Sequence, residues 1–193
     1  MNLVPPATLI IATVLLGASA PDARSQTTSV DQLIKKLPPP EKIAQSAVDP
    51  AIRDPLGKQA MESAKAMNFG NAYALSQKLA SRYPKSAAAQ CLYGQFALMM
   101  HKFPEAAAAF RKAIADQPNL AFAYLGHGLS EAAQQHLTAA ASDYRQVTEL
   151  APKADVGWVA LSACSEKMGR KRESLDYARQ ATAVAPSSAG AWY

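Results

Sequence analysis

The chain has 193 residues, a formal net charge of +5, and 49% hydrophobic residues against nine glycines. A chain of this composition can bury one ordinary hydrophobic core and is not generally disordered, and its many alanines favour helices over strands. Basic and acidic residues are interleaved, and the densest basic run is only Arg170-Lys171-Arg172. A run of three basic residues is more typical of a solvated turn than of a nucleic-acid or lipid site. No nucleic-acid partner is therefore expected.

The first 25 residues predict a signal peptide. An apolar run from Ala7 to Leu16 leads into several small residues, as in secretory signals. The run is shorter than the about 20 residues that a transmembrane helix needs, which favours cleavage over anchoring. Pro21 would hinder cleavage after Ala20, so we expect the cut after Ser25 and a periplasmic or secreted protein. The alternative is an uncleaved anchor, and only then is a membrane contact expected.

Residues 26–52 are expected to form a proline-containing linker. Its Pro38-Pro39-Pro40 run lacks backbone donors and favours an extended backbone. Before this run, the short amphipathic segment from Val30 to Leu37 has apolar residues at helical spacing. This segment is a candidate for docking onto another surface.

A 34-residue period organises the rest of the chain. It separates four prolines, namely Pro84, Pro118, Pro152 and Pro186. The same period aligns two sets of small residues: Ala60, Gly94, Gly128 and Ser162, and Ala72, Ala106, Ala140 and Ser174. Small residues allow helices to pack closely, and proline cannot continue a helix. Each period is therefore predicted to hold a helix, a turn, a second helix and a closing proline.

This pattern resembles the tetratricopeptide repeat, a 34-residue helix–turn–helix unit with aromatic, small and proline positions. The second unit carries the resemblance best, through Tyr93-Gly94, Phe103, Glu105-Ala106, Phe110, Ala113 and Pro118. The first unit diverges most, because Leu56 replaces an aromatic residue and Ser76 stands where Phe110 and Tyr144 stand in later units.

The resemblance implies an all-α fold, a right-handed helical solenoid of about four helix-turn-helix repeats. The expected units span residues 53–86, 87–120, 121–154 and 155–188, and residues 189–193 look like the start of an incomplete fifth repeat. An unsealed solenoid end exposes apolar surface. Two explanations stay open: the chain is a fragment of a longer protein, which we favour, or its last helices meet a partner.

The sequence offers no recognisable catalytic or metal-binding constellation. Two histidines, His101 and His136, fall at expected turns, and His127 falls on a packing face, without metal-ligand spacing. Cys91 and Cys164 fall in first helices two units apart, beyond the about 7 Å that a disulfide tolerates, so both are predicted to be buried thiols. No enzymatic activity, cofactor or metal is expected.

In the family that the sequence resembles, the first helices line a concave groove. The resemblance points nine residues into it: Cys91, Gln95, Leu98, Phe122, Leu125, Leu129, Val156, Val159 and Ala163. Family members that clamp a C-terminal carboxylate use Lys and Asn at such positions, which this chain lacks. A mostly apolar groove predicts a peptide or helix as ligand, and hence a non-catalytic protein–protein interaction scaffold. With the expected signal peptide, this scaffold is expected in the cell envelope.

Three alternatives to this scaffold stay open. The groove could be covered by the chain itself, through the segment from Val30 to Leu37 or through further repeats. The repeats could be an accessory domain of a larger exported protein whose activity lies beyond Tyr193. An enzyme would need catalytic residues in that further part.

Overall fold

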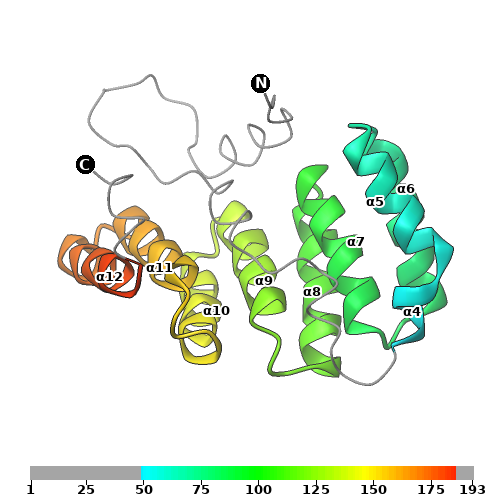
Figure 1. Cartoon of the computed structure of the whole chain (residues 1–193). Coiled ribbons are helices and arrows are strands. Elements are labelled where there is room, and N and C mark those ends of the chain that lie inside the picture. The colour runs from blue at the N-terminus through cyan, green and yellow to red at the C-terminus, as the bar shows by residue number, and fades with distance from the viewer. Residues whose placement is uncertain (1–48, 186–193) are drawn as a thin grey trace, which may run out of the picture.

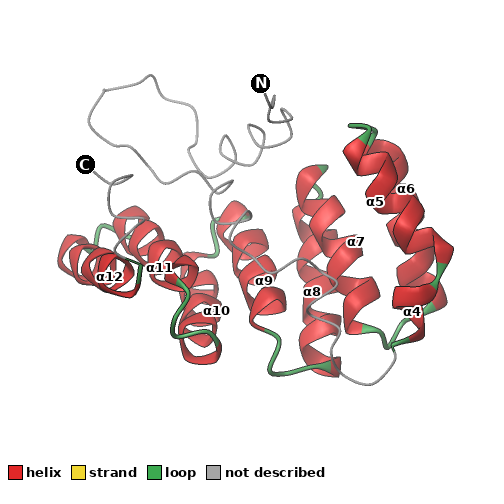
Figure 2. Cartoon of the chain, in the orientation of Figure 1, coloured by secondary structure: helices red, strands yellow, loops and turns green. Residues whose placement is uncertain are grey.

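The computed structural model describes residues 49–185, which form nine helices and contain no strand (Figure 2). The helices are α4 (Pro50–Arg53), α5 (Pro55–Lys65), α6 (Phe69–Arg82), α7 (Ala87–Met99), α8 (Phe103–Asp116), α9 (Ala121–Ala133), α10 (Leu137–Leu150), α11 (Asp155–Lys167) and α12 (Lys171–Val184). The expected signal peptide, nearly all of the linker with its amphipathic segment, Pro186 and the expected fifth repeat lie outside the described residues. None of the helices within residues 49–185 is both long and apolar enough to cross a membrane.

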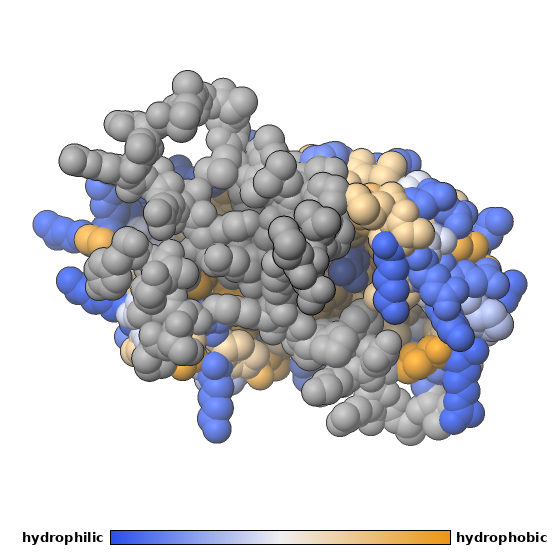
Figure 3. Space-filling view, turned by 45° about the horizontal axis from the view of Figure 1, so that its top comes forward, coloured by the Kyte–Doolittle hydropathy of each residue, from blue (hydrophilic) through white to orange (hydrophobic). Residues whose placement is uncertain are grey.

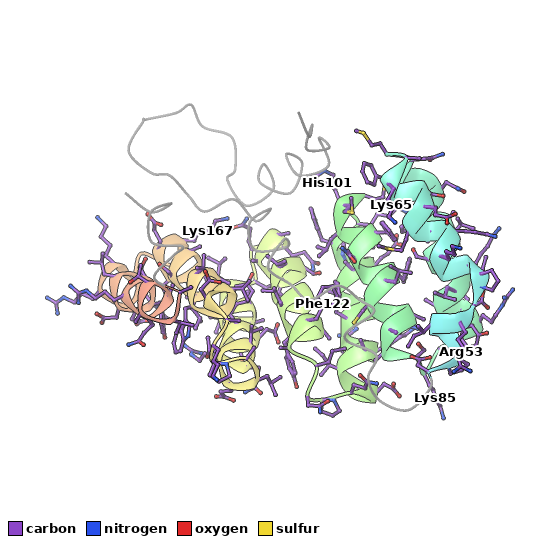
Figure 4. The ribbon with its side chains drawn as sticks, in the orientation of Figure 1. Arg53, Lys65, Lys85, His101, Phe122 and Lys167 are labelled. Carbon is purple, nitrogen blue, oxygen red and sulfur yellow. The ribbon has the colours of Figure 1, made fainter. Side chains whose placement is uncertain are left out.

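Helices α5 to α12 form four hairpins that stand side by side in a curved row (Figure 1). Each helix packs against the next in chain order, and α7 also contacts α9. His101 and Lys167 lie at one edge of the row, where the two helices of a hairpin are joined, whereas Arg53 and Lys85 lie at the opposite edge (Figure 4). The predicted all-α helical-repeat solenoid is confirmed.

The second helix of each hairpin ends because of the proline that follows it. Helices α6, α8 and α10 each end two residues before a proline, the first of these being Pro84. The intervening residue leaves the helical region, as Tyr83 does with φ −124° and ψ 70°. The proline ring clashes with a helical conformation of the residue before it, so the helix stops at that point.

The turn inside each hairpin contains one residue with a left-handed backbone. These residues are also spaced by 34 positions: Met67, His101, Gln135 and Gly169, with φ of 60°, 57°, 66° and 75°. In the second hairpin the N–H of Lys102 donates to the carbonyl of Ala97 at 2.8 Å, and that of His101 to Leu98 at 3.0 Å. This pair of bonds is the Schellman motif, whose left-handed position favours glycine. Only the fourth hairpin has glycine there.

Replacing Gln135 by glycine should therefore stabilise the protein. The side chain of Gln135 is exposed. A residue with a Cβ costs about 1–2 kcal/mol in the left-handed region. Glycine avoids this cost but loses more backbone entropy on folding, so the net gain is smaller. We expect Gln135→Gly to raise the free energy of unfolding by about 0.5 kcal/mol in urea denaturation. The reverse change, Gly169→Ala, should lower it. A destabilised Gln135→Gly protein would contradict this account of the turns.

The hairpins are held together by aromatic rings that fit against glycines. The ring of Phe110, on α8, lies between Gly94 of α7 and Gly126 of α9. A Cβ on Gly94 would lie 2.8 Å from Phe110 Cε2, and one on Gly126 would lie 2.3 Å from Phe110 Cζ. Neither distance is tolerated between carbon atoms in a packed core. The absence of a side chain at these two positions is what lets three helices meet.

The last hairpin closes in a different way at the positions predicted to be small. In the second hairpin these positions hold Gly94 and Ala106, which are buried. In the fourth they hold Ser162 and Ser174, and Ser162 Oγ donates to the Ser174 carbonyl at 2.9 Å. The two serines keep the close helix approach and add a hydrogen bond across it.

The start of the solenoid differs from the expected linker boundary at residue 52. Pro50–Arg53 forms the short helix α4, and Ala51 within it is only 2% exposed. Asp49 caps α4 and Asp54 caps α5, each followed directly by a proline, which is favourable at the first helical position because it lacks only an N–H that would be unpaired. The packed part of the chain therefore begins before residue 52.

Asp54 also links the start of α5 to the end of α6. Its carboxylate accepts hydrogen bonds from the N–H of Leu56 at 2.9 Å, from Arg82 Nη1 at 2.7 Å and from the hydroxyl of Tyr83 at 3.1 Å. The N–H of Leu56 and the guanidinium of Arg82 lower the pKa of Asp54 below its ordinary value of 3.8. A carboxylate with a lowered pKa stabilises the fold above that ordinary value, and this contribution is lost as the pH falls through the folded pKa.

Asp54→Asn should consequently lower the unfolding temperature at pH 7 and have a smaller effect at pH 3. Differential scanning calorimetry at both pH values measures the two effects. Asp176→Asn is the control, because Asp176 pairs with Arg179 on the surface, where its side chain is 70% exposed. An Asp54→Asn effect of equal size at pH 7 and pH 3 would show that the charge of Asp54 does not stabilise the fold.

Candidate peptide-binding face

The residues predicted to line the groove fall into two groups. Six are buried, with exposed fractions of at most 7%: Cys91, Phe122, Leu125, Leu129, Val156 and Val159. Gln95 and Leu98 are half-buried, and Ala163 is exposed. Surface accessible to a ligand is therefore concentrated, among the nine, on Gln95, Leu98 and Ala163. A role in binding stays a prediction for all of them.

The six buried residues help to join neighbouring repeats. Leu125 and Leu129 of α9 share a core cluster with Val156 and Val159 of α11. Phe122 lies on the side of α9 toward α8 (Figure 4), where its ring meets that of Phe110 edge-on with centroids 6.1 Å apart. These side chains fix the spacing between the first helices, and so the shape of any surface that those helices present.

The first helices α7, α9 and α11 differ in chemistry from the second helices that cover them. Every residue of α7 and α9 is buried or half-buried, and α7 carries no charged residue at all. The second helices expose charged side chains, such as Arg111 on α8 and Arg145 on α10. In Figure 3, hydrophilic side chains project at both ends of the described chain, and some hydrophobic residues show beside them. The first helices thus form a largely apolar layer, here called the inner layer.

Two polar atoms of the inner layer are buried without a hydrogen-bond partner in the part of the chain that the structure describes. They are Gln95 Oε1 on α7 and Trp158 Nε1 on α11. A buried polar group without a partner costs about 1–3 kcal/mol, so such groups are rare and call for an explanation. Both atoms have almost no accessible surface, and rotation of the half-buried Gln95 side chain would be needed to bring its Oε1 within reach of a ligand donor.

A cluster of two tyrosines, a lysine and a glutamate lies across the first two hairpins. The hydroxyls of Tyr73 and Tyr93 both donate to Glu105 Oε2, the second at 2.8 Å. Lys102 Nζ lies 3.4 Å from Glu105 Oε1 and 4.5 Å from the centre of the Tyr73 ring. The sequence did not reveal this cluster, because its members come from α6, α7 and the region where α8 starts, without a common spacing.

The ionisation of this cluster suits a structural role. Burial raises the pKa of Tyr73 and of Tyr93, so both phenols stay protonated and act as donors. Hydrogen bonds from Tyr73 and Tyr93 lower the pKa of Glu105. An ionised carboxylate that already accepts from two phenols is a poor general base. The cluster therefore ties α6 to α7 and α8.

A second polar cluster joins α9 to α10 around His127. Its Nδ1 lies 2.8 Å from Asp143 Oδ2, and its Nε2 lies 3.7 Å from Glu131 Oε1. Glu131 Oε2 in turn lies 2.8 Å from Nδ1 of His136, in the turn before α10. His127 thus lies on a packing face and His136 in a turn, as predicted. Across residues 49–185, no three His, Cys, Asp or Glu side chains are arranged to hold a metal ion.

Both cysteines are free and buried, as the sequence predicted. Cys91 is 3% exposed and Cys164 is 4% exposed. The thiol of Cys164 donates to the carbonyl of Leu137 at 3.2 Å. Burial raises the pKa of both thiols, which disfavours the reactive thiolate. The two residues act as small packing groups between helices.

Known proteins resemble this chain in structure but not detectably in sequence family. No family model matches the sequence, and no curated protein matches it either. A crystal structure of MamA superposes with a TM-score of 0.66 at 20% sequence identity, covering 78% of this chain and 87% of that one. MamA from Desulfovibrio magneticus RS-1, residues 41 to the end, gives a TM-score of 0.65 at 16% identity, covering 69% of this chain and 75% of that one.

A third match is a tetratricopeptide-repeat domain solved with a ligand. It is the first such domain of Spaghetti (RPAP3) bound to the HSP90 peptide SRMEEVD, with a TM-score of 0.57 and 22% identity, covering 59% of this chain and 90% of that one. At these identities the similarity concerns the fold alone. The protein therefore has the fold of a tetratricopeptide-repeat protein, as the sequence pattern predicted.

Proposed function

We propose that the protein is a non-catalytic scaffold that binds a peptide or helix of another protein along its inner layer. The observation that carries this proposal is the largely apolar inner layer, on which Leu98 is half-buried and Ala163 is exposed. The fold supports it, because a domain of the same fold, the first of RPAP3, was solved with a bound HSP90 peptide. A stack of parallel hairpins offers a long surface rather than a closed pocket, which suits an extended or helical ligand.

The chemistry of the inner layer favours a ligand with an apolar face and free backbone donors. Helix α7 contains no Lys or Arg, and on α9 the side chain of His127 is already engaged by Asp143 and Glu131. An acidic peptide terminus would find no free cation on these two helices, and in the inner layer only α11 carries a Lys or Arg, the exposed Lys167 at its end. Leu98 supplies apolar contact, and Gln95 Oε1 can accept a backbone N–H from the ligand.

Photo-crosslinking tests whether this face binds a protein. A photoreactive phenylalanine analogue is placed at Leu98 or Ala163, and, as matched controls on second helices, at Arg111 or Arg145, which are exposed. Irradiation in envelope extract should give a discrete adduct from the first two positions and none from the controls. Adducts from the control positions alone would place binding on the other face and refute the proposal.

Gln95→Leu should separate binding from folding. The change removes an unpaired buried oxygen and keeps the side-chain volume, so the free energy of unfolding should stay the same or rise by up to about 1 kcal/mol. Loss of one hydrogen bond to the ligand should weaken binding about tenfold, measured as the concentration of competitor that blocks the Leu98 adduct. Unchanged competition would show that Gln95 Oε1 does not contact the ligand.

The proposed location is the cell envelope, on the strength of the amino-terminal apolar run. Mass spectrometry of the exported protein should find Gln26 as the first residue. An exported protein that retains Met1 would overturn cleavage and favour an anchored form.

A further inference from the structure

A pocket of about 360 Å³ lies at the far end of the row of hairpins, between α11 and α12. Val159 and Ser162 of α11 line it, together with Leu175, Ala178, Arg179, Ala181 and Thr182 of α12. Leu175 is 60% exposed, which is more than any other large hydrophobic residue among residues 49–185. An apolar surface of this kind calls for a covering group.

The 34-residue period shows what covers the same surface one repeat earlier. The residues 34 positions before Leu175, Ala178, Ala181 and Thr182 are Ala141, Tyr144, Val147 and Thr148, and all four are buried. Helix α11 packs against the helix that carries them, α10. The close approach falls at Gly157, where a Cβ would lie 2.8 Å from Thr148 Cγ2 and 3.1 Å from Val147 Cγ1. The pocket is therefore the place where the first helix of a next repeat would pack.

The chain itself supplies residues for that place. Positions 189–193 stand 34 residues after positions 155–159, which begin α11, and the helix before them ends at Val184 as α10 ends at Leu150. Trp192 stands where α11 has Trp158. We propose that residues 189–193 pack into the pocket as the first turn of a fifth repeat.

Two compensating changes of side-chain size support this occupant over an unrelated one. Ala191 is larger than its counterpart Gly157, and its expected neighbour Ala181 is smaller than the counterpart Val147. The contact that Val147 Cγ1 would make with a Cβ at 3.1 Å is therefore absent beside Ala181. The nearer contact, at 2.8 Å from Thr148 Cγ2, is kept because its counterpart Thr182 is also a threonine, so Ala191 would lie slightly farther from α12 than Gly157 lies from α10. An exchange of larger for smaller side chains across a contact is tolerated best when the packed volume changes little.

The second exchange involves an aromatic residue. Tyr144 and Val159 belong to one core cluster, and their counterparts in the next repeat are Ala178 and Tyr193. The large side chain has changed sides between the two helices. Alanine at position 178 leaves space in the pocket, and tyrosine at position 193 brings the volume to fill it.

A pair of engineered cysteines tests the proposed contact in the full chain. Because Gly157 faces Thr148, the counterparts Ala191 and Thr182 should have Cβ atoms within the range that a disulfide bridges. The double variant Thr182→Cys, Ala191→Cys should form an intramolecular disulfide in high yield on mild oxidation, read by mass spectrometry of peptides and by non-reducing gels. The control pair is Gln180→Cys with Ala191→Cys, since Gln180 is exposed and lies on another face of α12.

The outcomes separate the occupants of the pocket. A high yield for the first pair and a low yield for the control support the proposal, and equal yields or no bond overturn it. Disulfide-linked dimers of the first pair would show that a second copy occupies the pocket, which also overturns it. As an independent reading, Tyr193→Ala in the full chain should increase the binding of a hydrophobic dye at least twofold. Unchanged dye binding would count against residues 189–193 as the cover.

Discussion

Gly126→Ala is expected to destabilise the protein by about 2–3 kcal/mol, although alanine is the better helix former. The added methyl group would lie 2.3 Å from Phe110 Cζ and 2.4 Å from its Cε1. Phe110 is 1% exposed and is held from the other side by Gly94, so its ring cannot move away without shifting α7. The cost of overpacking therefore exceeds the about 1 kcal/mol that alanine gains over glycine in a helix.

Gly70→Ala is the matched control for this prediction. Gly70 also lies in a helix, but a Cβ there would have no atom within 4 Å. Its replacement should raise the free energy of unfolding by about 0.5 kcal/mol, so the two glycines should respond in opposite directions in urea denaturation. A Gly126→Ala protein as stable as the Gly70→Ala protein would mean that the fit of Phe110 between α7 and α9 does not hold the hairpins together.

The period of the sequence predicted most of the fold because each repeat must solve the same packing problem. Close helix contact needs small residues at the positions of Gly94 and Gly128, and a chain reversal needs the break that Pro118 enforces, so these residues recur visibly. The left-handed turn positions recur just as regularly, but Met67 and Gln135 have nothing in common in sequence. Their conformation is imposed by the packing of the hairpin, not by residue type.

The candidate site was less predictable than the fold. Sequence alone placed nine residues in a groove by resemblance, but it could not show that Val156 and Leu125 would be buried while Gln95 would keep an unpaired oxygen. Burial depends on how neighbouring hairpins meet, and a hydrogen-bond deficit depends on every atom around the group. The link from Tyr73 to Glu105 escaped for the same reason, since 32 positions separate the two residues.

Substitutions at Phe110 and Gly126 should show that the sizes of the two side chains at one interface between repeats are energetically coupled. Phe110 and Gly126 have as their counterparts, 34 residues earlier, Ser76 and Leu92. Ser76 is 0% exposed and Leu92 is 7% exposed, so both residues are buried. In this pair the larger side chain lies on the first helix of a hairpin, whereas Phe110 lies on a second helix. Phe110→Ser alone should cost about 3–5 kcal/mol because it leaves a cavity, and Gly126→Leu alone should cost at least as much as Gly126→Ala because it overpacks.

The double variant Phe110→Ser, Gly126→Leu should be more stable than the sum of the two single changes predicts, by about 2–3 kcal/mol. Leucine at position 126 would enter the space that the ring has left, because the first pair of repeats already combines serine and leucine at the corresponding positions 76 and 92. Additive losses in a double-mutant cycle, measured by urea denaturation, would contradict this reading of the interfaces. A coupled result would mean that the spacing between α7 and α9, and with it the shape of the inner layer, depends on the summed volume of each pair and not on one required aromatic residue.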